Sequence, residues 1–266
     1  MDRSALLERL ESAEEVPEIF SACKDMATSL DFPHFVYAVR VPISITQPYH
    51  FSLSGYPPEW RRLYDENGYL SIDPIIAHVL TSLKPVIWDQ IPREQPKVQH
   101  FFAEAEAYGL THGLTIPIYG RGGEVGLFSV ARDQTLPESA ASRIELTSQI
   151  QWFAVHVHEA VRSVVLNREG RPIVRGNLSA REKDCLVWAA DGKTSWEISR
   201  ILQITERTVN YHLQNASEKL GVHGSRNAVA KAIALGEIET PHYDLLPKSR
   251  MPVIHWHTPV TGAQTH

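Results

Sequence analysis

The sequence has little of what secreted, membrane-spanning or metal-holding chains require. Its two cysteines, Cys23 and Cys185, lie far apart, so we expect neither a disulfide framework nor a cysteine-based metal cluster. Apolar runs such as residues 161–166 are short and interrupted by charge, so we expect no membrane-spanning segment. The first residues are acidic and amphipathic, unlike a signal peptide. We therefore expect a cytoplasmic protein.

What is present is the composition of a globular protein with room for two domains. The chain has 266 residues, of which 43% are hydrophobic and 21% charged. Residues 1–170 carry 14 Lys and Arg against 22 Asp and Glu, whereas residues 171–236 carry 10 against 6. An acidic first part followed by a basic second part indicates that the second part meets a polyanion.

The first half mixes helical and strand patterns. Strands are predicted over 35–41 and 84–88, and the segment GLTIPIYGRGGEVGLFSVARD has two β-rich runs around a glycine turn, which predicts a hairpin. Helices are predicted over 3–12, 15–30, 74–82, 101–110 and 137–166, and another should begin at the two prolines after Tyr56. This order predicts an α/β fold, an α-β-α sandwich with an antiparallel sheet, followed by an all-α helix-turn-helix domain.

Residues 167–177, NREGRPIVRGN, combine three arginines with two glycines and a proline between periodic segments, as is typical of a linker. We therefore divide the chain into four parts. They are an N-terminal domain of residues 1–168, a linker of residues 169–177, a C-terminal domain of residues 178–240 and a flexible extension of residues 241–266. The extension contains His255 and His257, which lack the further ligands that a metal site needs.

The stretch YPPEWRRLYDENGYLSIDP, residues 56–74, places three polar-tipped rings at helical spacing. Tyr56, Trp60 and Tyr64 are four residues apart, and Asp73 follows the predicted helix end. Such rings are usual in a protein core, where their polar tips find partners. The alternative is the wall of a binding pocket, and this stretch alone favours the core.

The C-terminal half begins with two reciprocal capping boxes. Ser179 is followed by Glu182, and Thr194 by Glu197, so each pair predicts a helix start. Thr205 caps a third helix. Short consecutive helices of this kind predict a helix-turn-helix, with the third helix as the recognition helix. A four-helix bundle with a solvated face is the alternative.

The third predicted helix has one apolar and one polar face. Its apolar stripe contains Val209, Leu213, Ala216 and Leu220. Arg, Asn and Gln side chains read bases or hold phosphates, so the polar face should meet DNA. The candidate DNA-binding residues are Thr205, Arg207, Thr208, Asn210, Tyr211, Gln214, Asn215, Lys193 and Lys219.

The segment EKDCLVWAADGKTSWEISRILQITERTVNYHLQNASEKLGV resembles the DNA-binding domain of LuxR-type regulators. The matching residues are Glu182, Leu186, Ala189, Gly192, Lys193, Glu197, Ile198, Val209, His212, Lys219 and Leu220. The resemblance implies a homodimer that binds a palindromic double-stranded DNA site, with RNA polymerase as a further partner. It also implies that the fourth helix pairs two copies, and we expect its Ala228, Val229, Ala232 and Ile233 to be exposed for this purpose.

The N-terminal half resembles the autoinducer-binding domain of acyl-homoserine-lactone receptors. The matching residues are Tyr56, Trp60, Tyr64, Asp73, Pro74, Trp88, Gly113, Pro117 and Ser129. The resemblance implies an N-acyl-homoserine lactone as ligand, no other cofactor, and quorum-sensing control of transcription. It places the dimer surface on the long helix after Pro137.

The chemistry of such a ligand assigns a role to each polar residue. Trp60 is a donor and suits the lactone carbonyl, ionised Asp73 is an acceptor and suits the amide N–H, and Tyr56 and Ser129 can donate to the amide carbonyl. An apolar wall for the ring and the tail should come from Tyr64, Trp88, Phe101, Ala105 and Leu110, and Thr115 is a further ligand-binding candidate. Arg61 could either reach a tail oxo group through water or lie on the surface. For Asp73 the alternative is a helix-starting residue before Pro74.

Three rival functions stay open from the sequence. The same pocket could sense another small molecule, or the protein could be a ligand-independent or ligand-released repressor. The third rival is a lactone-processing enzyme with a DNA-binding tail. We find neither a catalytic nucleophile–base pair nor a metal cluster in the sequence, so we expect that the protein is not an enzyme.

Overall fold

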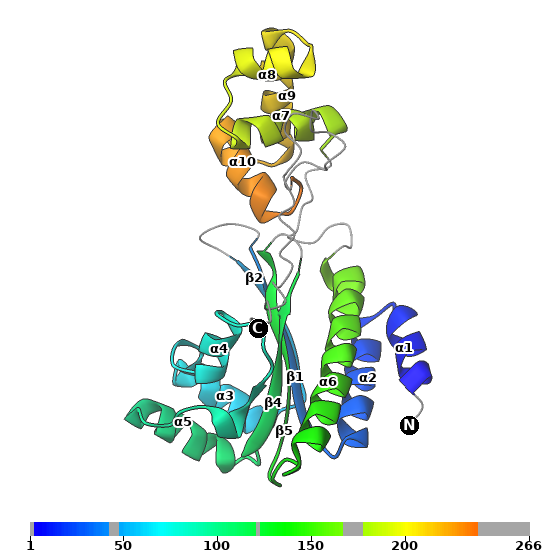
Figure 1. The fold of residues 1–266 in the computed structure, drawn as a ribbon, viewed down its shortest axis with the longest axis vertical. Coiled ribbons are helices and arrows are strands. Elements are labelled where there is room, and N and C mark those ends of the chain that lie inside the picture. The colour runs from blue at the N-terminus through cyan, green and yellow to red at the C-terminus, as the bar shows by residue number, and fades with distance from the viewer. Residues whose placement is uncertain (1–2, 43–47, 121–122, 167–177, 239–266) are drawn as a thin grey trace, which may run out of the picture.

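The computed structural model describes residues 3–42, 48–120, 123–166 and 178–238. The described elements form two groups, one before residue 167 and one after residue 177 (Figure 1). The predicted linker, the extension with its two histidines and the loop at 43–47 lie outside the described residues. None of the described helices is long and apolar enough to cross a membrane, and the described residues contain no metal-binding group of three or more His, Cys, Asp or Glu.

The first group is the predicted sandwich around one antiparallel sheet, and this fold class is confirmed. The five strands lie in the order β2-β1-β5-β4-β3. Their bounds are β1 (His34–Val41), β2 (Tyr49–Ser54), β3 (Val86–Ile87), β4 (His112–Tyr119) and β5 (Val125–Arg132). The predicted hairpin is β4–β5. Strand β2 was not predicted, because an edge strand with polar residues on one face carries little hydrophobic signal.

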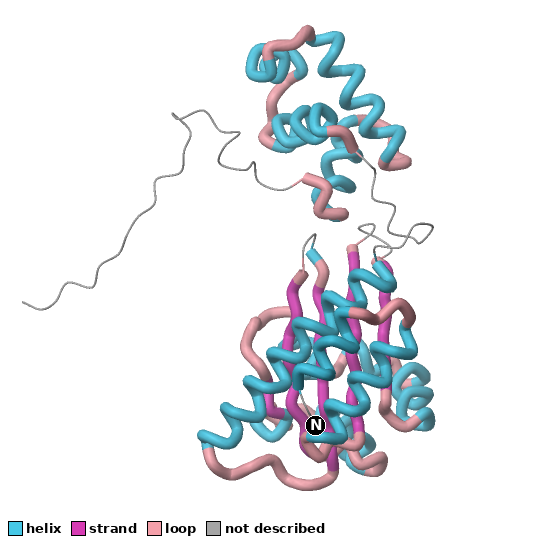
Figure 2. Tube along the Cα trace, turned by 90° about the vertical axis from the view of Figure 1, so that its right-hand side faces the viewer, coloured by secondary structure: helices cyan, strands magenta, loops and turns pink. Residues whose placement is uncertain are grey.

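Helices cover both faces of this sheet (Figures 1 and 2). One face carries α1 (Arg3–Glu11), α2 (Val16–Ser29) and α6 (Ala140–Val161), which ends in a π-helical turn, η4 (Arg162–Leu166). The other carries α3 (Pro58–Glu66), α4 (Pro74–Val79) and α5 (Pro96–Glu106), with short 3-10 turns η1 (Tyr69–Ser71) and η2 (Trp88–Gln90). The prediction placed the end of α4 three residues too late and the start of α5 five residues too late. The helices α3, α4 and α5 each begin at a proline, whose fixed φ suits the first helical turn.

The face under α2 and α6 is a packed core. Phe128 on β5 is fully buried and contacts Phe35 and Phe153, with ring centroids 6.3 and 5.8 Å away. Within this core Glu124 accepts a 2.5 Å hydrogen bond from Arg162 and lies 3.2 Å from His158. His158 in turn hydrogen-bonds the Tyr37 hydroxyl at 2.8 Å. The buried charges are therefore matched with one another.

The second group is the predicted helix-turn-helix, with α7 (Ala180–Ala190), α8 (Ser195–Leu202), α9 (Glu206–Lys219) and α10 (Ser225–Ala234). Both capping boxes form, and Thr205 caps α9. The apolar stripe of α9 is buried as predicted. The expectation for α10 was wrong in part: Ala228 and Ala232 are 0% exposed because they pack into this domain's own core, whereas Ile233 is exposed.

Candidate functional site

A cavity of about 700 Å³ lies between the sheet and the helices α3, α4 and α5. It brings together side chains that are far apart in the sequence. Ten of the eleven predicted ligand-binding residues line it: Tyr56, Trp60, Arg61, Tyr64, Asp73, Trp88, Phe101, Ala105, Leu110 and Ser129. Thr115 does not line the cavity but lies directly behind its wall. The volume falls in the usual range for small-molecule sites.

Trp60 presents a buried hydrogen-bond donor at this cavity. Its side chain is 3% exposed and packs among Tyr64, Tyr69, Phe101 and Tyr108, with ring centroids 5.7–6.0 Å away. No described residue accepts a hydrogen bond from its indole N–H. Because Trp60 lines the cavity and its N–H is not used by another described residue, this N–H suits an acceptor on a bound ligand.

Asp73 caps the helix α4 and also lines the cavity. Its Oδ1 caps α4 by accepting from the Ile75 N–H at 2.8 Å, and its Oδ2 accepts from the Tyr64 hydroxyl at 2.9 Å. Burial raises the pKa of Asp73 from 3.8 to about 6, although these hydrogen bonds oppose the shift. A carboxylate has about four acceptor positions, so Asp73 still has room for a ligand N–H.

Tyr64 and Tyr56 lie with Asp73 at the polar centre of the cavity, but the two tyrosines come from different elements. Tyr64 lies on α3 and positions Asp73, which is a more specific role than the apolar wall that we predicted for it. Tyr56 precedes α3, which begins at Pro58, so the prediction that three rings lie on one helix was wrong. The hydroxyl of Tyr56 interacts with Ser129, and burial raises the pKa of both tyrosines, with the charge of Asp73 as the next cause.

Hydrogen-bonded hydroxyl groups hold the part of the cavity wall that contains Trp88. The Trp88 indole N–H donates to Thr115 Oγ1 at 2.9 Å, and Thr115 is hydrogen-bonded to Ser129. The indole N–H of Trp88 therefore already has a partner in the protein, and its ring contributes an apolar surface to the cavity wall. Gly113 is required beneath this ring, because a Cβ at that position would lie 2.5 Å from the indole carbons.

Several residues of the cavity were missed by sequence reasoning. Four come from α4 and its end, Ile75, Ile76, Val79 and Leu80, and others come from the inner face of β1, β2 and β5. Tyr69 was also missed; it does not line the cavity, but it is buried behind the wall, with its ring 5.3 Å from that of Phe101. The apolar spacing of α4 was a usable signal, whereas the contribution of β2 depends on a strand that was not predicted.

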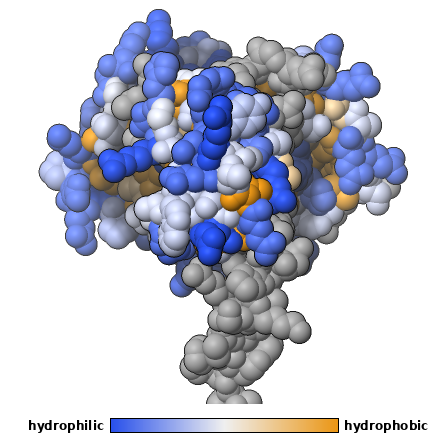
Figure 3. Space-filling model, turned by 90° about the horizontal axis from the view of Figure 1, so that it is seen from above, coloured by the Kyte–Doolittle hydropathy of each residue, from blue (hydrophilic) through white to orange (hydrophobic). Residues whose placement is uncertain are grey.

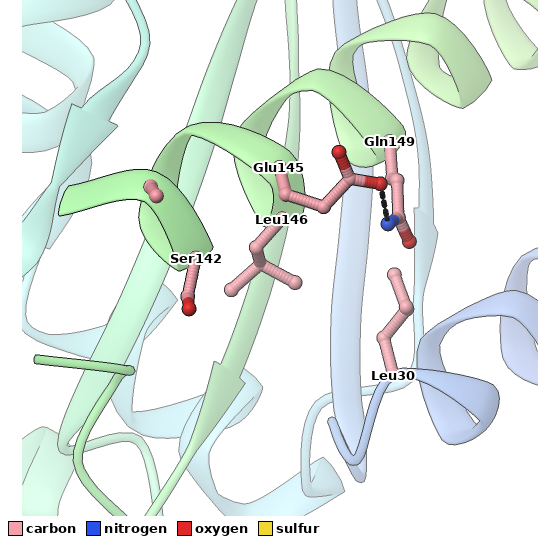
Figure 4. A pocket seen from close by; sticks show the side chains of 6 residues that line it. Leu30, Ser142, Glu145, Leu146 and Gln149 are labelled. Carbon is pink, nitrogen blue, oxygen red and sulfur yellow. Dashed lines mark hydrogen bonds between the residues drawn. The ribbon is translucent and has the colours of Figure 1, made fainter. Parts of the chain in front are cut away.

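A second hollow lies on the outer side of the sandwich, between the end of α2 and the start of α6 (Figure 4). Its wall contains Leu30, Leu146 and the pair Glu145 and Gln149, which hydrogen-bond each other at 2.5 Å. These polar groups are neighbours on one exposed helix and do not converge on an enclosed space. The cavity at Trp60 and Asp73 is therefore the candidate ligand site.

The helix α9 offers a polar face for DNA. Arg207, Tyr211 and Gln214 are exposed on it, opposite the buried stripe. Viewed from the end of the molecule that carries α8, the surface is mainly hydrophilic, with small separate hydrophobic areas (Figure 3). A recognition helix needs such a surface to meet base edges and phosphates.

Most of the other predicted DNA-binding residues have partners within the domain. Lys219 donates to the buried Glu182 at 2.8 Å and so joins α9 to α7. Asn210 accepts from Ser195 at 2.6 Å and joins α9 to α8. Thr205 and Thr208 form the cap of α9, Asn215 is half-buried, and Lys193 lies 3.9 Å from Asp191.

Comparisons with known proteins agree with this geometry. Residues 15–161 match the family described as autoinducer binding domain, and residues 176–232 match bacterial regulatory proteins, luxR family. The transcriptional activator protein AnoR of Acinetobacter nosocomialis is 33% identical over 219 residues, which cover 82% of this chain and 91% of AnoR.

Three solved structures of two proteins are also similar. Escherichia coli SdiA has a TM-score of 0.73 at 27% identity, covering 89% of this chain and 98% of SdiA, and a structure of SdiA in complex with octanoyl-rac-glycerol has the same TM-score. CepR2 of Burkholderia cenocepacia, described as N-acylhomoserine lactone dependent, has a TM-score of 0.51 at 25% identity, covering 63% of this chain and 94% of CepR2.

Proposed function

Because this chain belongs to the LuxR family of bacterial transcriptional regulators, we propose that its cavity binds an N-acyl-homoserine lactone and that this ligand controls DNA binding. The chain is a ligand-binding regulator of transcription and not an enzyme. We assign ligand sensing to residues 1–168 and DNA binding to residues 178–240.

One observation carries the choice of ligand. The cavity presents a donor without a protein partner, the Trp60 N–H, close to an acceptor with free capacity, the Asp73 carboxylate. Tyr56 and Ser129 add hydroxyl groups at the same centre. An acyl-homoserine lactone has a ring carbonyl, an amide N–H and an amide carbonyl, which match these groups one by one.

DNA binding is assigned to α9 in a homodimer. A single short helix in one groove binds weakly, and two half-sites of a palindrome add their binding energies. The surface of α6 supports pairing of two copies, because Ile144, Trp152 and Val155 are exposed there and share one helix face. On α10 the exposed Ile233 is available for a contact between the two DNA-binding domains. RNA polymerase is then the partner of the DNA-bound dimer.

The ligand acts by completing the hollow side of the N-terminal domain. A molecule that binds only the folded state stabilises it by mass action. Filling the cavity between α3, α4, α5 and the sheet thereby favours the dimer that presents two copies of α9 to DNA. In a ligand-released repressor, filling the same cavity would instead favour the state that does not bind DNA.

Thermal unfolding across a panel of acyl-homoserine lactones tests the proposal. We expect a selective rise of the unfolding midpoint in the wild-type protein, and the rise should disappear in Asp73→Ala. The matched control is Asp65→Ala, because Asp65 lines the same cavity but is exposed, and its rise should persist. No rise with any lactone in a folded protein would contradict the proposed ligand.

A second candidate ligand is an acylglycerol. It is favoured by the similarity to SdiA, of which a structure in complex with octanoyl-rac-glycerol is known. Glycerol hydroxyls can donate to Asp73, and the ester carbonyl can accept from Trp60. Octanoyl-rac-glycerol therefore belongs in the panel, and a rise with it but with no lactone would select this candidate.

A further inference from the structure

The cavity is chemically different at its two ends, and the register of the sheet shows how. Rows of residues directly opposite each other cross β2, β1, β5 and β4. The first row contains Ser54, Val36 and Ser129 and lies at the polar centre, next to Tyr56. Since side chains alternate along a strand, every second row faces the cavity.

The middle row is mainly apolar. It contains Ala38 between Leu127 and Ser52, whose hydroxyl is the polar group of the row, and the helix α4 adds Ile75 and Val79 to the same cavity. A hydrocarbon chain is suited to this part of the cavity, whereas a charged group there would be desolvated without a partner.

The third row is cationic and faces solvent. Arg40 lies directly opposite His50, both line the cavity and both are exposed. Neither side chain has a hydrogen-bond or ion-pair partner among the residues that the structure describes. The other charged residues that line the cavity are Asp73 and, on α3, Arg61 and Asp65, which are one turn apart.

We propose that the natural ligand carries an acyl chain that ends in an anionic hydrogen-bond acceptor, such as a carboxylate, and that Arg40 with His50 recognises this end. The inference rests on the proposed function, since it takes the head group to lie at Trp60 and Asp73. An anionic end at the third row remains in contact with water and gains a guanidinium partner, while the chain behind it is buried.

The same geometry sets the length of the chain. Arg40 is four positions after Val36, so the first and third rows are about 13 Å apart at about 3.3 Å per strand residue. Three single bonds of an extended chain span at most about 3.6 Å, so about eleven bonds cover this distance. Decanoyl and dodecanoyl chains therefore reach Arg40, whereas a hexanoyl chain ends in the apolar middle row.

The experiment compares pairs of ligands of equal length. Hexanoyl-, octanoyl-, decanoyl- and dodecanoyl-homoserine lactone are each prepared in two forms, one with the terminal methyl and one with a carboxylate in its place. Dissociation constants are measured by calorimetric titration of the full chain. For the two longer chains we expect the carboxylate form to bind about three-fold more tightly, as for an exposed ion pair. For hexanoyl we expect it to bind at least about ten-fold more weakly.

Substitutions locate the effect. Arg40→Met should abolish the advantage of the long carboxylate forms over the methyl forms of equal length, and Arg40→Lys should retain most of that advantage. Arg62→Met is the matched control, because Arg62 is an exposed arginine on α3 that pairs with Glu66 and does not line the cavity. It should leave both forms unchanged.

The possible failures are distinct. If the methyl forms bind but the carboxylate forms are weaker at every length, the inference about the tail is overturned and the proposed function stands. An advantage that survives in Arg40→Met overturns the role of Arg40. If no form of any length binds, the proposed ligand class itself fails, and the inference fails with it.

Discussion

The two faces of the N-terminal sheet are formed by the same strands but differ in how tightly they are packed. On one face the long helices α2 and α6 press large side chains such as Phe128 and Phe153 against the sheet, and buried charges such as Glu124 and Arg162 are paired. On the other, the short helices α3, α4 and α5 enclose a cavity, and the Trp60 N–H has no partner among the described residues. The packed face maintains the shape of the sheet, so the hollow face can leave groups free for a ligand.

The largest expected difference between the faces concerns aromatic truncation. Phe128→Ala should lower the free energy of unfolding by about 3–5 kcal/mol, because Phe128 is fully buried in the packed core. Phe101→Ala should cost clearly less, because that ring already borders empty volume. Urea unfolding of both variants without ligand measures the difference, and equal losses would show that the hollow face is packed as tightly as the other.

The buried charges give the next largest effect. Glu124→Gln should lower the free energy of unfolding by about 3–4 kcal/mol, because it leaves the Arg162 guanidinium buried without its carboxylate. On the hollow face, Asp65→Asn removes an exposed carboxylate and should stay within about 0.5 kcal/mol. Urea unfolding at neutral pH compares the two, and a loss below about 1 kcal/mol for Glu124→Gln would mean that the pairing is not needed.

Asp73 makes the stability of the hollow face depend on pH. Its pKa is 3.8 in the unfolded chain and about 6 in the fold, so the folded state binds more protons between these values. Stability should therefore fall as the pH rises from about 4 to about 6, by up to about 3 kcal/mol, and this component should be constant above that.

Asp73→Asn keeps a good helix cap and removes the titration, so it isolates this component. The measurement is the free energy of unfolding of the ligand-free wild-type and variant proteins at about pH 4 and about pH 7. The two proteins should differ in the change between these pH values. An identical change in both would mean that the carboxyl of Asp73 is not desolvated in the ligand-free fold.

The smallest effects come from adding volume to each face. Ala154→Leu should cost about 1–3 kcal/mol, because Ala154 is fully buried under the sheet and the larger side chain overpacks that core. Ala38→Leu adds the same volume to the middle of the cavity, so it should leave stability nearly unchanged and weaken ligand binding instead. Thermal unfolding with and without lactone checks both, and a large loss of stability for Ala38→Leu would contradict a hollow at that position.

Local sequence was enough for the features that depend on neighbouring residues. The capping boxes of α7 and α8, the β4–β5 hairpin and the buried stripe of α9 were all predicted and are all present. Each needs only residues within a few positions of one another, whose spacing sets the helix face or the turn. Ten residues of the cavity wall were also predicted, but only because the chain resembles a known family.

Tertiary structure decided which of those residues already have a hydrogen-bond partner in the protein and which can still bind a ligand. Trp88 and Trp60 have the same donor, yet the pairing of β3 with β4 brings Thr115 to Trp88, while Trp60 is left facing the cavity. The pairing of β2 with β1 sets His50 beside Arg40, and the folding of α10 against α7 and α9 buries Ala228. These outcomes depend on contacts between residues distant in the chain, and the periodicity of a single segment carries no information about its partner.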